Sequence, residues 1–380
     1  MYQLCDFSSA QFLRQHWQQS PCVLSGVLHD FVDPLDEHDL AGLAQEEAID
    51  SRIISQHNQQ WQVTEGPFFE FSDVCVGAWT LMVQGVDAHI EEAAALMKAF
   101  DFIPHWRMDD LLVSFSQPGA GVGAHVDQYD VFIIQGKGQR RWQVGAKPEQ
   151  LNQHYPHPKL QQSDEFAPLI DVLLNPGDVL YIPPGFPHKG ESISPCMNYS
   201  VGFRAPQQME LVQAIADDLL DTGKPTQRFV DPKRADNQQP AAISEHDMAA
   251  LKQLLTDYVA NPKVDEVLTQ YLSKQTDSLD NYAMEDPLCI EELTALLHQG
   301  ITLRHACGVR PVYLAEQHSD SFMFCINGEM FTVSGDERLL TEPLLNQTQS
   351  NLTYSPAMSG VWIEVLRDLI NRGYIDIVSE

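Results

Sequence analysis

Ser116-Gln-Pro-Gly-Ala-Gly-Val-Gly-Ala-His-Val-Asp127 is the part of this 380-residue sequence from which the fold can be inferred. A Gly-rich turn follows an apolar stretch and leads into a His-x-Asp motif. Side chains on a strand alternate between two faces, so His125, Asp127 and Tyr129 share one face if this segment is extended. An imidazole and a carboxylate at that spacing can bind one metal ion.

A second segment, Asn175-Pro-Gly-Asp-Val-Leu-Tyr-Ile-Pro-Pro-Gly-Phe-Pro-His188, supplies a candidate third ligand. Pro-Gly-Asp and Pro-Pro-Gly are typical of tight turns on either side of a short strand. Two histidines and a carboxylate form the facial triad of non-haem Fe(II) oxygenases, which leaves positions open for substrate and oxygen. The sequence therefore predicts a metal site made of His125, Asp127 and His188. A structural zinc site is disfavoured because no Cys flanks these residues.

The His-x-acid spacing alone carries little weight, because 14 His at an acidic frequency of 53 in 380 give about two matches by chance. The sequence has three such matches, at His89, His125 and His318. His89 lies in a predicted helix, where residues i and i+2 do not face each other, and no His follows His318. The alternative is that His125 and His188 are ordinary polar residues in turns. The two complete segments together favour the metal site.

Residues 109–202 alternate short apolar stretches with Gly/Pro turns, which is typical of a barrel or a double-sheet jelly roll. We predict strands over 111–116, 130–135, 141–144, 172–174, 179–182 and 199–203. Residues 1–105 are mixed, with predicted helices over 9–17, 39–48 and 87–100 and a strand over 21–24.

The pattern becomes helical after Pro206. Apolar residues at three- and four-residue spacing predict helices over 208–221, 245–260, 262–274 and 290–299, and the polar stretch 231–240 is a predicted loop. Further on, we predict strands over 312–315, 321–326 and 329–333, with Asn327-Gly328 as a hairpin turn, then a helix over 360–371 and a strand over 374–378. The predicted fold is α+β, with units at 1–205, 206–300 and 301–380.

The chain carries a formal net charge of −30, from 53 Asp plus Glu against 23 Lys plus Arg. The excess is even, because residues 1–205 hold 26 acids and 11 bases and residues 206–380 hold 27 and 12, a net of −15 each. A surface so negative disfavours direct binding to nucleic acid or to an anionic membrane, and suits a cationic partner or serves solubility.

Targeting and redox features point to one compartment. The seven Cys have no disulfide or zinc-finger spacing, the N-terminus has no signal-peptide pattern, and no run approaches 18 apolar residues. We therefore expect a cytoplasmic protein.

Residues from about 100 to 205 resemble the JmjC branch of the cupin-type 2-oxoglutarate oxygenases. The string His125-Val-Asp-Gln-Tyr-Asp-Val-Phe-Ile-Ile-Gln-Gly-Lys-Gly-Gln-Arg-Arg-Trp-Gln-Val144 is similar to the ribosomal oxygenases. The resemblance implies a double-stranded β-helix with Fe(II), and 2-oxoglutarate and O2 as cosubstrates. It also implies a helical dimerisation region, hence a homodimer, and a C-terminal winged-helix domain. The most similar members hydroxylate an arginine (C-beta) of large-subunit ribosomal protein sixteen, a basic protein substrate.

A guanidinium inside the barrel would bind the carboxylate of 2-oxoglutarate that lies away from the metal. Alternation on the strand after Lys137 places Arg140 with Trp142 and Val144 on the more apolar face, which selects Arg140 over Arg141. The family's basic residue aligns at the same position. The alternative is that both arginines are solvated at the surface.

Parity on the strand at 110–116 places Asp110 and Ser114 on one face with Leu112 and Ser116. This polar face either meets solvent or lines a ligand-binding barrel. In the second case Ser114 would help to hold the cosubstrate carboxylate. The substrate roles agree with the resemblance: Asp110 would pair with a substrate guanidinium, Tyr129 would stack on it, and Ser200 would contact it.

Other functions stay open at this point. A histidyl hydroxylase or a lysine demethylase would share these motifs, a metal cupin that does not use 2-oxoglutarate would share the triad, and a catalytically silent binding module is a third class. The helices over 208–300 form a dimer interface or only cover the barrel. The hairpin and helix after 320 suit a winged helix, but the region lacks the basic charge that nucleic-acid binding requires, so a protein-contact role is favoured.

Overall fold

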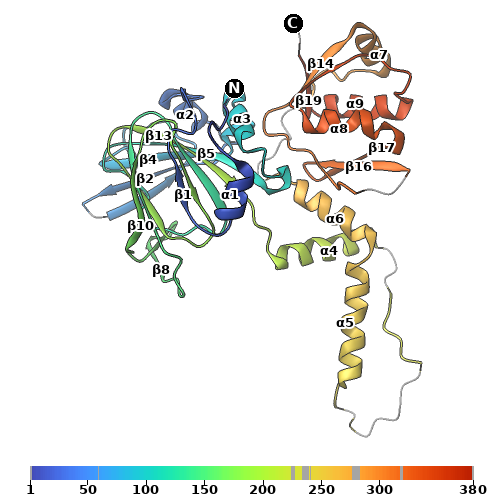
Figure 1. The fold of residues 1–380 in the computed structure, drawn as a ribbon, viewed down its shortest axis with the longest axis horizontal. Helices are drawn as coiled ribbons and strands as arrows, with labels where there is room; N and C mark the ends of the chain where they lie inside the picture. The colour runs from blue at the N-terminus through green and yellow to red at the C-terminus, as the bar shows by residue number, and fades with distance from the viewer. Residues whose placement is uncertain are drawn as a thin grey trace.

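The computed structural model describes residues 2–58, 60–223, 227–232, 239, 241–275, 283–316 and 320–378. A β-rich N-terminal unit is joined by a helical region to a smaller α+β unit (Figure 1). His318 and most of the predicted loop at 231–240 lie outside the described residues. No helix among the described residues combines the length and apolar character that crossing a membrane requires.

Two antiparallel sheets form the N-terminal unit. The larger sheet has eight strands in the order β1 (Cys22–Leu24), β11 (Val179–Ile182), β6 (Asp130–Gln135), β13 (Cys196–Phe203), β5 (Met108–Ser116), β4 (Ala78–Val83), β2 (Ser51–His57) and β3 (Gln60–Glu65). The smaller sheet has the order β10 (Pro168–Leu174), β7 (Arg140–Gly145) and β12 (His188–Ser192). A separate hairpin consists of β8 (Gln153–His157) and β9 (Leu160–Ser163). All six strands predicted between 109 and 203 are present, and they lie in two antiparallel sheets, as the predicted double-sheet architecture requires.

The central strands of the large sheet are buried on both faces, with different chemistry on each. On β6, Phe132 and Ile134 join the main apolar core, whereas Val131 and Ile133 face the space between the two sheets. β13 and β5 send their apolar residues to the main core in the same way, and their alternate positions line a cavity between the sheets. The polar face predicted on β5 is therefore an interior face.

The outer face of the large sheet is covered by short helices. The main core includes residues of α1 (Ser9–Gln15), α2 (Glu37–Leu43) and α3 (Glu91–Met97), such as Phe12, Leu40 and Leu96. The single helix predicted over 87–100 is wrong. It is divided into the 3-10 turn η1 (Val86–Ala88), α3 and the 3-10 turn η2 (Lys98–Phe100), because the backbone of Ile90 is extended, with φ −122° and ψ 119°. The side chain of Asp87, in η1, is buried and accepts a hydrogen bond from the backbone of β5. A further 3-10 turn, η3 (His105–Arg107), precedes β5.

The helical region contains α4 (Gln208–Thr222), α5 (Glu245–Val259) and α6 (Pro262–Ser273), close to the predicted bounds. α4 packs against α6, and α6 contacts β16 of the C-terminal unit. α5 extends away from the rest of the chain (Figure 1) and has no buried residue. Its apolar side chains are therefore left exposed in a single chain.

The C-terminal unit has its own apolar core, to which Leu293 and Leu297 of α7 (Ile290–Gln299) belong. Helix α7 packs on α9 (Gly360–Asn371), so this core begins before residue 301. The other elements are α8 (Arg338–Asn346), the 3-10 turn η4 (Gly335–Glu337), a sheet of β14 (Ile301–His305), β18 (Gln349–Leu352) and β19 (Ile375–Val378), and a sheet of β15 (Val312–Tyr313), β16 (Ser321–Ile326) and β17 (Glu329–Ser334). The predicted hairpin is confirmed, with positive φ at both Asn327 and Gly328.

Candidate active site

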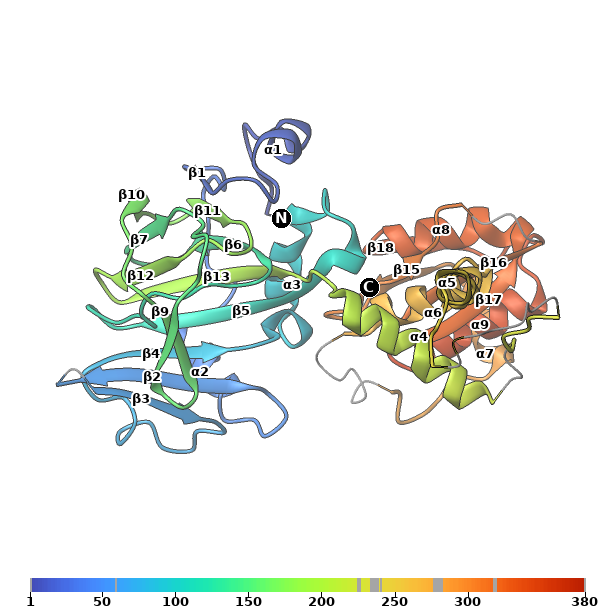
Figure 2. The same cartoon turned by 90° about the horizontal axis from the view of Figure 1, so that it is seen from below.

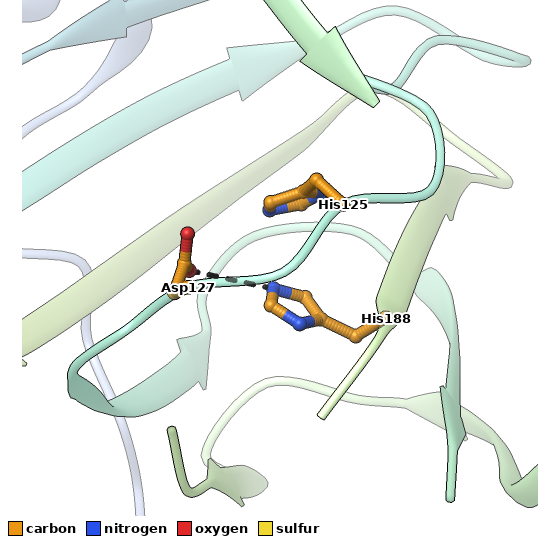
Figure 3. Close-up of side chains that lie close together, drawn as sticks. All are labelled: His125, Asp127 and His188. Atoms are coloured by element: carbon orange, nitrogen blue, oxygen red, sulfur yellow. Dashed lines mark ion pairs between the residues drawn. The ribbon is translucent and has the colours of Figure 1, made fainter. Parts of the chain in front are cut away.

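The two predicted ligand segments meet at one end of the space between the sheets. His125 and Asp127 lie on the segment between β5 and β6, and His188 is the first residue of β12 (Figure 3). One possible ligand atom from each residue lies within 4.8 Å of the others. In the parts of the chain that the structure describes, no other group of three such side chains was found.

The segment His125-Val-Asp127, whose shared face depended on an extended backbone, is a loop with a single β-bridge. The backbone N–H of His125 donates to the carbonyl of His188 at 3.0 Å, and that of His188 donates back at 2.9 Å. Gly185 N–H donates to the carbonyl of Asp127 at 2.8 Å. Thus the turn before β12, rather than a continuous ladder, fixes the ligand loop.

Backbone carbonyls orient both imidazoles. His125 Nδ1 lies 3.1 Å from the carbonyl of Gly123, and His188 Nδ1 lies 3.0 Å from that of Phe186. A carbonyl can only accept, so each Nδ1 carries a proton and Nε2 is the ring nitrogen that each histidine has left for a metal ion. His188 Nε2 is 3.6 Å from Asp127 Oδ2. This arrangement of ring nitrogens is typical of metal-binding histidines.

The electrostatics of the triad also suit a cation. Burial, together with His125, lowers the pKa of His188 to about 4, although Asp127 opposes the shift. His188 is therefore neutral near pH 7, as a metal ligand must be. Two imidazoles and a carboxylate are the donor set of a non-haem iron site. The residues present thus fit such an ion.

A cavity of about 320 Å³ extends from the triad between the two sheets. Its walls include every site residue predicted from the sequence: the triad, Arg140 and Ser114, and Asp110, Tyr129 and Ser200. Apolar side chains line the same space, among them Leu112, Val131 and Ile133. The structure therefore brings all eight predicted residues to one cavity.

Arg140 is only 3% exposed and faces this cavity with Trp142, as strand parity predicted. One guanidinium nitrogen donates to Ser116 Oγ at 3.0 Å and to Asn198 Oδ1 at 3.4 Å, and the other donates to the carbonyl of Gly190 at 3.3 Å. No carboxylate among the described residues lies within ion-pair distance. Burial lowers the pKa of Arg140, but a guanidinium stays charged near pH 7.

Within the described part of the chain, two buried donors beside the cavity have no hydrogen-bond partner, namely Arg140 Nε and Trp142 Nε1. Buried polar groups are normally satisfied, and an uncompensated buried cation is costly. Both features would be resolved by a carboxylate ligand between the sheets. Arg141, in contrast, is exposed and binds Asp171 through two hydrogen bonds of 2.7 and 2.6 Å.

The predicted substrate residues line the same cavity. Asp110 is buried, and its Oδ2 accepts hydrogen bonds from Gln84 Nε2 at 2.6 Å and from Gly85 N–H at 3.1 Å. Tyr129 is 42% exposed at the mouth. Desolvation and the carboxylates of Asp127 and Asp110 raise the pKa of Tyr129, so its hydroxyl stays protonated.

Sequence reasoning missed several residues that line or support this cavity. Asn198 and Ser116 contact Arg140, and alternation on β13 and β5 was a signal that pointed to both. Arg52 on β2 and Lys159 between β8 and β9 also line it. No local pattern points to these two, because β2, β8 and β9 were not predicted as strands.

The loop before His125 is held by the β8–β9 hairpin. Ser163 N–H donates to the carbonyl of Ala124 at 2.8 Å, and Gln162 Nε2 donates to that of Val122 at 2.8 Å. Gly123 has φ +81°, and a Cβ there would lie 2.0 Å from Gln162 Nε2. The positive φ and the contact with Gln162 thus favour glycine at position 123.

Residues 95–211 match the family model described as JmjC domain. The chain is 39% identical over 370 residues, 96% of each chain, to the ribosomal protein uL16 3-hydroxylase of Escherichia coli (strain K12). The chain belongs to the JmjC-type ribosomal oxygenase family. The X-ray structure of E. coli YcfD is similar to this oxygenase fold with a TM-score of 0.92 and 38% identity, over 99% of this chain and 100% of that one. A YcfD structure in complex with cobalt and 2-oxoglutarate has a TM-score of 0.89 and 36% identity over 100% of both chains.

Proposed function

We propose that this ribosomal oxygenase hydroxylates the side chain of an arginine in ribosomal protein uL16, at its β-carbon. The observation that carries the proposal is a single cavity with a triad of possible metal ligands at one wall and, at another, a buried arginine that has no carboxylate partner among the described residues. The support for the substrate is the 39% identity to the uL16 3-hydroxylase over 96% of both chains.

Fe(II) and 2-oxoglutarate are the cofactor and cosubstrate of the JmjC oxygenases, and the residues of this site fit both. His125, Asp127 and His188 would hold the iron through two Nε2 atoms and a carboxylate oxygen. Iron, 2-oxoglutarate and O2 together supply the oxidising chemistry that converts a C–H bond into an alcohol. The chain itself has to bind, orient and shield the reacting groups.

Arg140 would bind the carboxylate of 2-oxoglutarate that lies away from the metal. Its unpartnered Nε and the Nη atoms form the planar fork that matches a carboxylate. Ser114 lies on β5 of the larger sheet, lines the same cavity and would add a hydroxyl donor. Ser116 and Asn198 accept hydrogen bonds from one Nη atom of the guanidinium, so the orientation of the group is set before the ligand binds.

The arginine side chain of the substrate would enter at the opposite end. Asp110 would attract its guanidinium, Tyr129 would stack on it, and Ser200 would contact it from β13. Apolar walls at Leu112 and Ile133 would exclude water from the C–H bond. The formal charge of −30 suits capture of a basic ribosomal protein before RNA covers it.

The deciding experiment combines the protein, Fe(II), 2-oxoglutarate and O2 with uL16-derived peptides. We expect the gain of one oxygen atom on one arginine and an equal amount of succinate. The same peptide with that arginine replaced by lysine, and a ribosomal peptide containing histidine, serve as matched controls. Oxidation of a control peptide with none on the arginine peptide would overturn the proposal and favour a lysine demethylase or a histidyl hydroxylase.

We also propose a homodimer formed through the helical region. Met248, Leu251, Leu255 and Val259 follow one stripe of α5 and are between 39% and 70% exposed. A long helix with an exposed apolar stripe and no buried residue is stable when a partner covers it. The proposed units are the catalytic 1–205, the dimerisation region 206–300 and a winged-helix-like 301–380 with a protein-contact role and no direct nucleic-acid ligand. Helix α7, at the end of the second range, packs in the core of the third unit. We expect the protein to act in the cytoplasm.

A further inference from the structure

One arginine of the C-terminal unit reaches the strand that carries Asp110. Arg310 lies between β14 and β15, and its side chain is 10% exposed. It donates to Oδ2 of Asp87, whose side chain is 4% exposed, and to the backbone carbonyl of Asp109. Both views place α3 and its neighbouring turns between the barrel and the C-terminal unit (Figures 1 and 2).

The groups that Arg310 and Asp87 bind belong to the two peptide bonds on either side of Asp110. The carbonyl of Asp109 belongs to the peptide bond before Asp110. Asp87 Oδ1 accepts at 2.8 Å from the N–H of Leu111, which belongs to the peptide bond after it. Gln84 and Gly85, which lie just before Asp87 in the chain, donate two hydrogen bonds to the Asp110 carboxylate.

The sheet itself is irregular at this point. β13 pairs Val201 with Leu111 and Phe203 with Met108, so one extra residue of β5 bulges opposite Gly202. β4 pairs with β5 only from Val113 onward. Bulges redirect side chains beside active sites and leave the ladder locally disrupted. The hydrogen bonds of Asp87 and Arg310 take the place of regular ladder bonds around Asp110.

We propose that Arg310 is a positioning residue for the substrate end of the cavity, through which the C-terminal unit sets the affinity for the cationic substrate side chain. The inference rests on the proposed function of Asp110 as the partner of that side chain. Without Arg310, the peptide bond before Asp110 and the Asp87 carboxylate lose their shared partner. The carboxylate of Asp110 then populates orientations that do not meet the substrate.

Steady-state kinetics of full-length variants test this role. In Arg310→Met we expect the KM for the uL16 peptide to rise on the order of tenfold. The KM for 2-oxoglutarate is expected to stay within twofold, because Arg140 lies on β7 of the other sheet. Arg310→Lys keeps the cation and is expected to recover part of the lost affinity. A purely structural role would lower kcat through loss of folded enzyme and leave the peptide KM unchanged.

Arg304→Met is the matched control, because Arg304 pairs with Glu91 at the same interface but reaches no group of β5. We expect wild-type KM values for this variant. Should Arg310→Met fail to fold, the Asp87→Asn/Arg310→Met double variant removes the buried ion pair and keeps an acceptor for Leu111. A folded variant with wild-type peptide KM would overturn the inference while the hydroxylase function stands. A wild-type enzyme that leaves the uL16 peptide unmodified would refute the proposed function, and this inference with it.

Discussion

Replacing Arg140 by Met should abolish useful binding of 2-oxoglutarate without unfolding the protein. A bidentate bond between a guanidinium and a carboxylate comprises two charge-assisted hydrogen bonds, each about 1.5–3 kcal/mol. Their loss corresponds to about 3–6 kcal/mol, or roughly a 10²- to 10⁴-fold rise in the KM for 2-oxoglutarate. Arg141→Met removes an exposed ion pair on the other face of the same strand and is expected to leave that KM unchanged.

The stability of the ligand-free variant tests the same reasoning independently. Arg140 is a buried cation without a carboxylate partner among the described residues. Ser116 keeps its hydrogen bond to Thr80 and Asn198 keeps that to Gln135 when the guanidinium is gone. Removing an uncompensated buried charge is favourable, so ligand-free Arg140→Met should be at least as stable as ligand-free wild type.

Thermal unfolding with Co(II), under anaerobic conditions, measures both the affinity for 2-oxoglutarate and the stability of the ligand-free protein. 2-Oxoglutarate at 100 times the wild-type Kd stabilises the wild type by about 2.7 kcal/mol, and a protein with a 100-fold weaker Kd by only about 0.4 kcal/mol. A variant that retains the full ligand-induced shift in Tm, or a KM within threefold of wild type, would refute the assignment of Arg140. So would a variant several kcal/mol less stable than wild type without the ligand.

Three further predictions concern the metal, the dimer and the C-terminal unit. Asp127→Ala removes the only anionic ligand of the triad, so stoichiometric Fe(II) binding and peptide-dependent succinate formation should both be lost. An unchanged metal affinity in calorimetry would contradict this. Leu255→Glu places a charge on a side chain that is 70% exposed, and light scattering should show the mass fall from twice 42.8 kDa to 42.8 kDa. Burial, His105 and Lys98 lower the pKa of His305 to about 4 from 6.5, so the folded state binds fewer protons than the unfolded state between these values. The free energy of unfolding should therefore fall as the pH drops from 6.5 to 4, by up to about 1.4 kcal/mol per pH unit, and His305→Gln should flatten that slope in denaturant titrations.

The alternation of side chains along each strand was the sequence pattern that best predicted which residues face the interior, because it depends only on the geometry of the strand. It placed Arg140 and Trp142 in the interior and Arg141 outside, and the structure confirms both. It also placed Asp110 and Ser114 on one face of β5, although the sequence could not decide whether that face was solvated. Whether that face meets solvent depends on the smaller sheet, which covers it. The strands of this sheet come from distant parts of the chain, so a local pattern does not show it.

The misses have a common physical cause, namely tertiary hydrogen bonds that override local patterns. Ala-rich residues 87–100 have good helix propensity, but Asp87 lies in a separate 3-10 turn whose side chain bonds to β5 and Arg310, and the chain is extended at Ile90 before α3 begins. The His125 segment has strand-like alternation, but its backbone hydrogen bonds go to His188 and Gly185, and the residue before it bonds to the β8–β9 hairpin. None of these partners could be identified from a local window of sequence.

The net charge of −30 acquires a more specific meaning from the position of the buried arginine. In so acidic a chain most cations find a carboxylate, and Arg107, Arg141 and Arg310 each lie within ion-pair distance of an aspartate. Arg140 has no such partner in the described part of the chain, although burial makes its charge more costly than that of an exposed residue. Placing acids near it would stabilise the ligand-free protein and compete with 2-oxoglutarate. The acidic surface can therefore attract a basic protein, while the interior keeps one cation for a dicarboxylate.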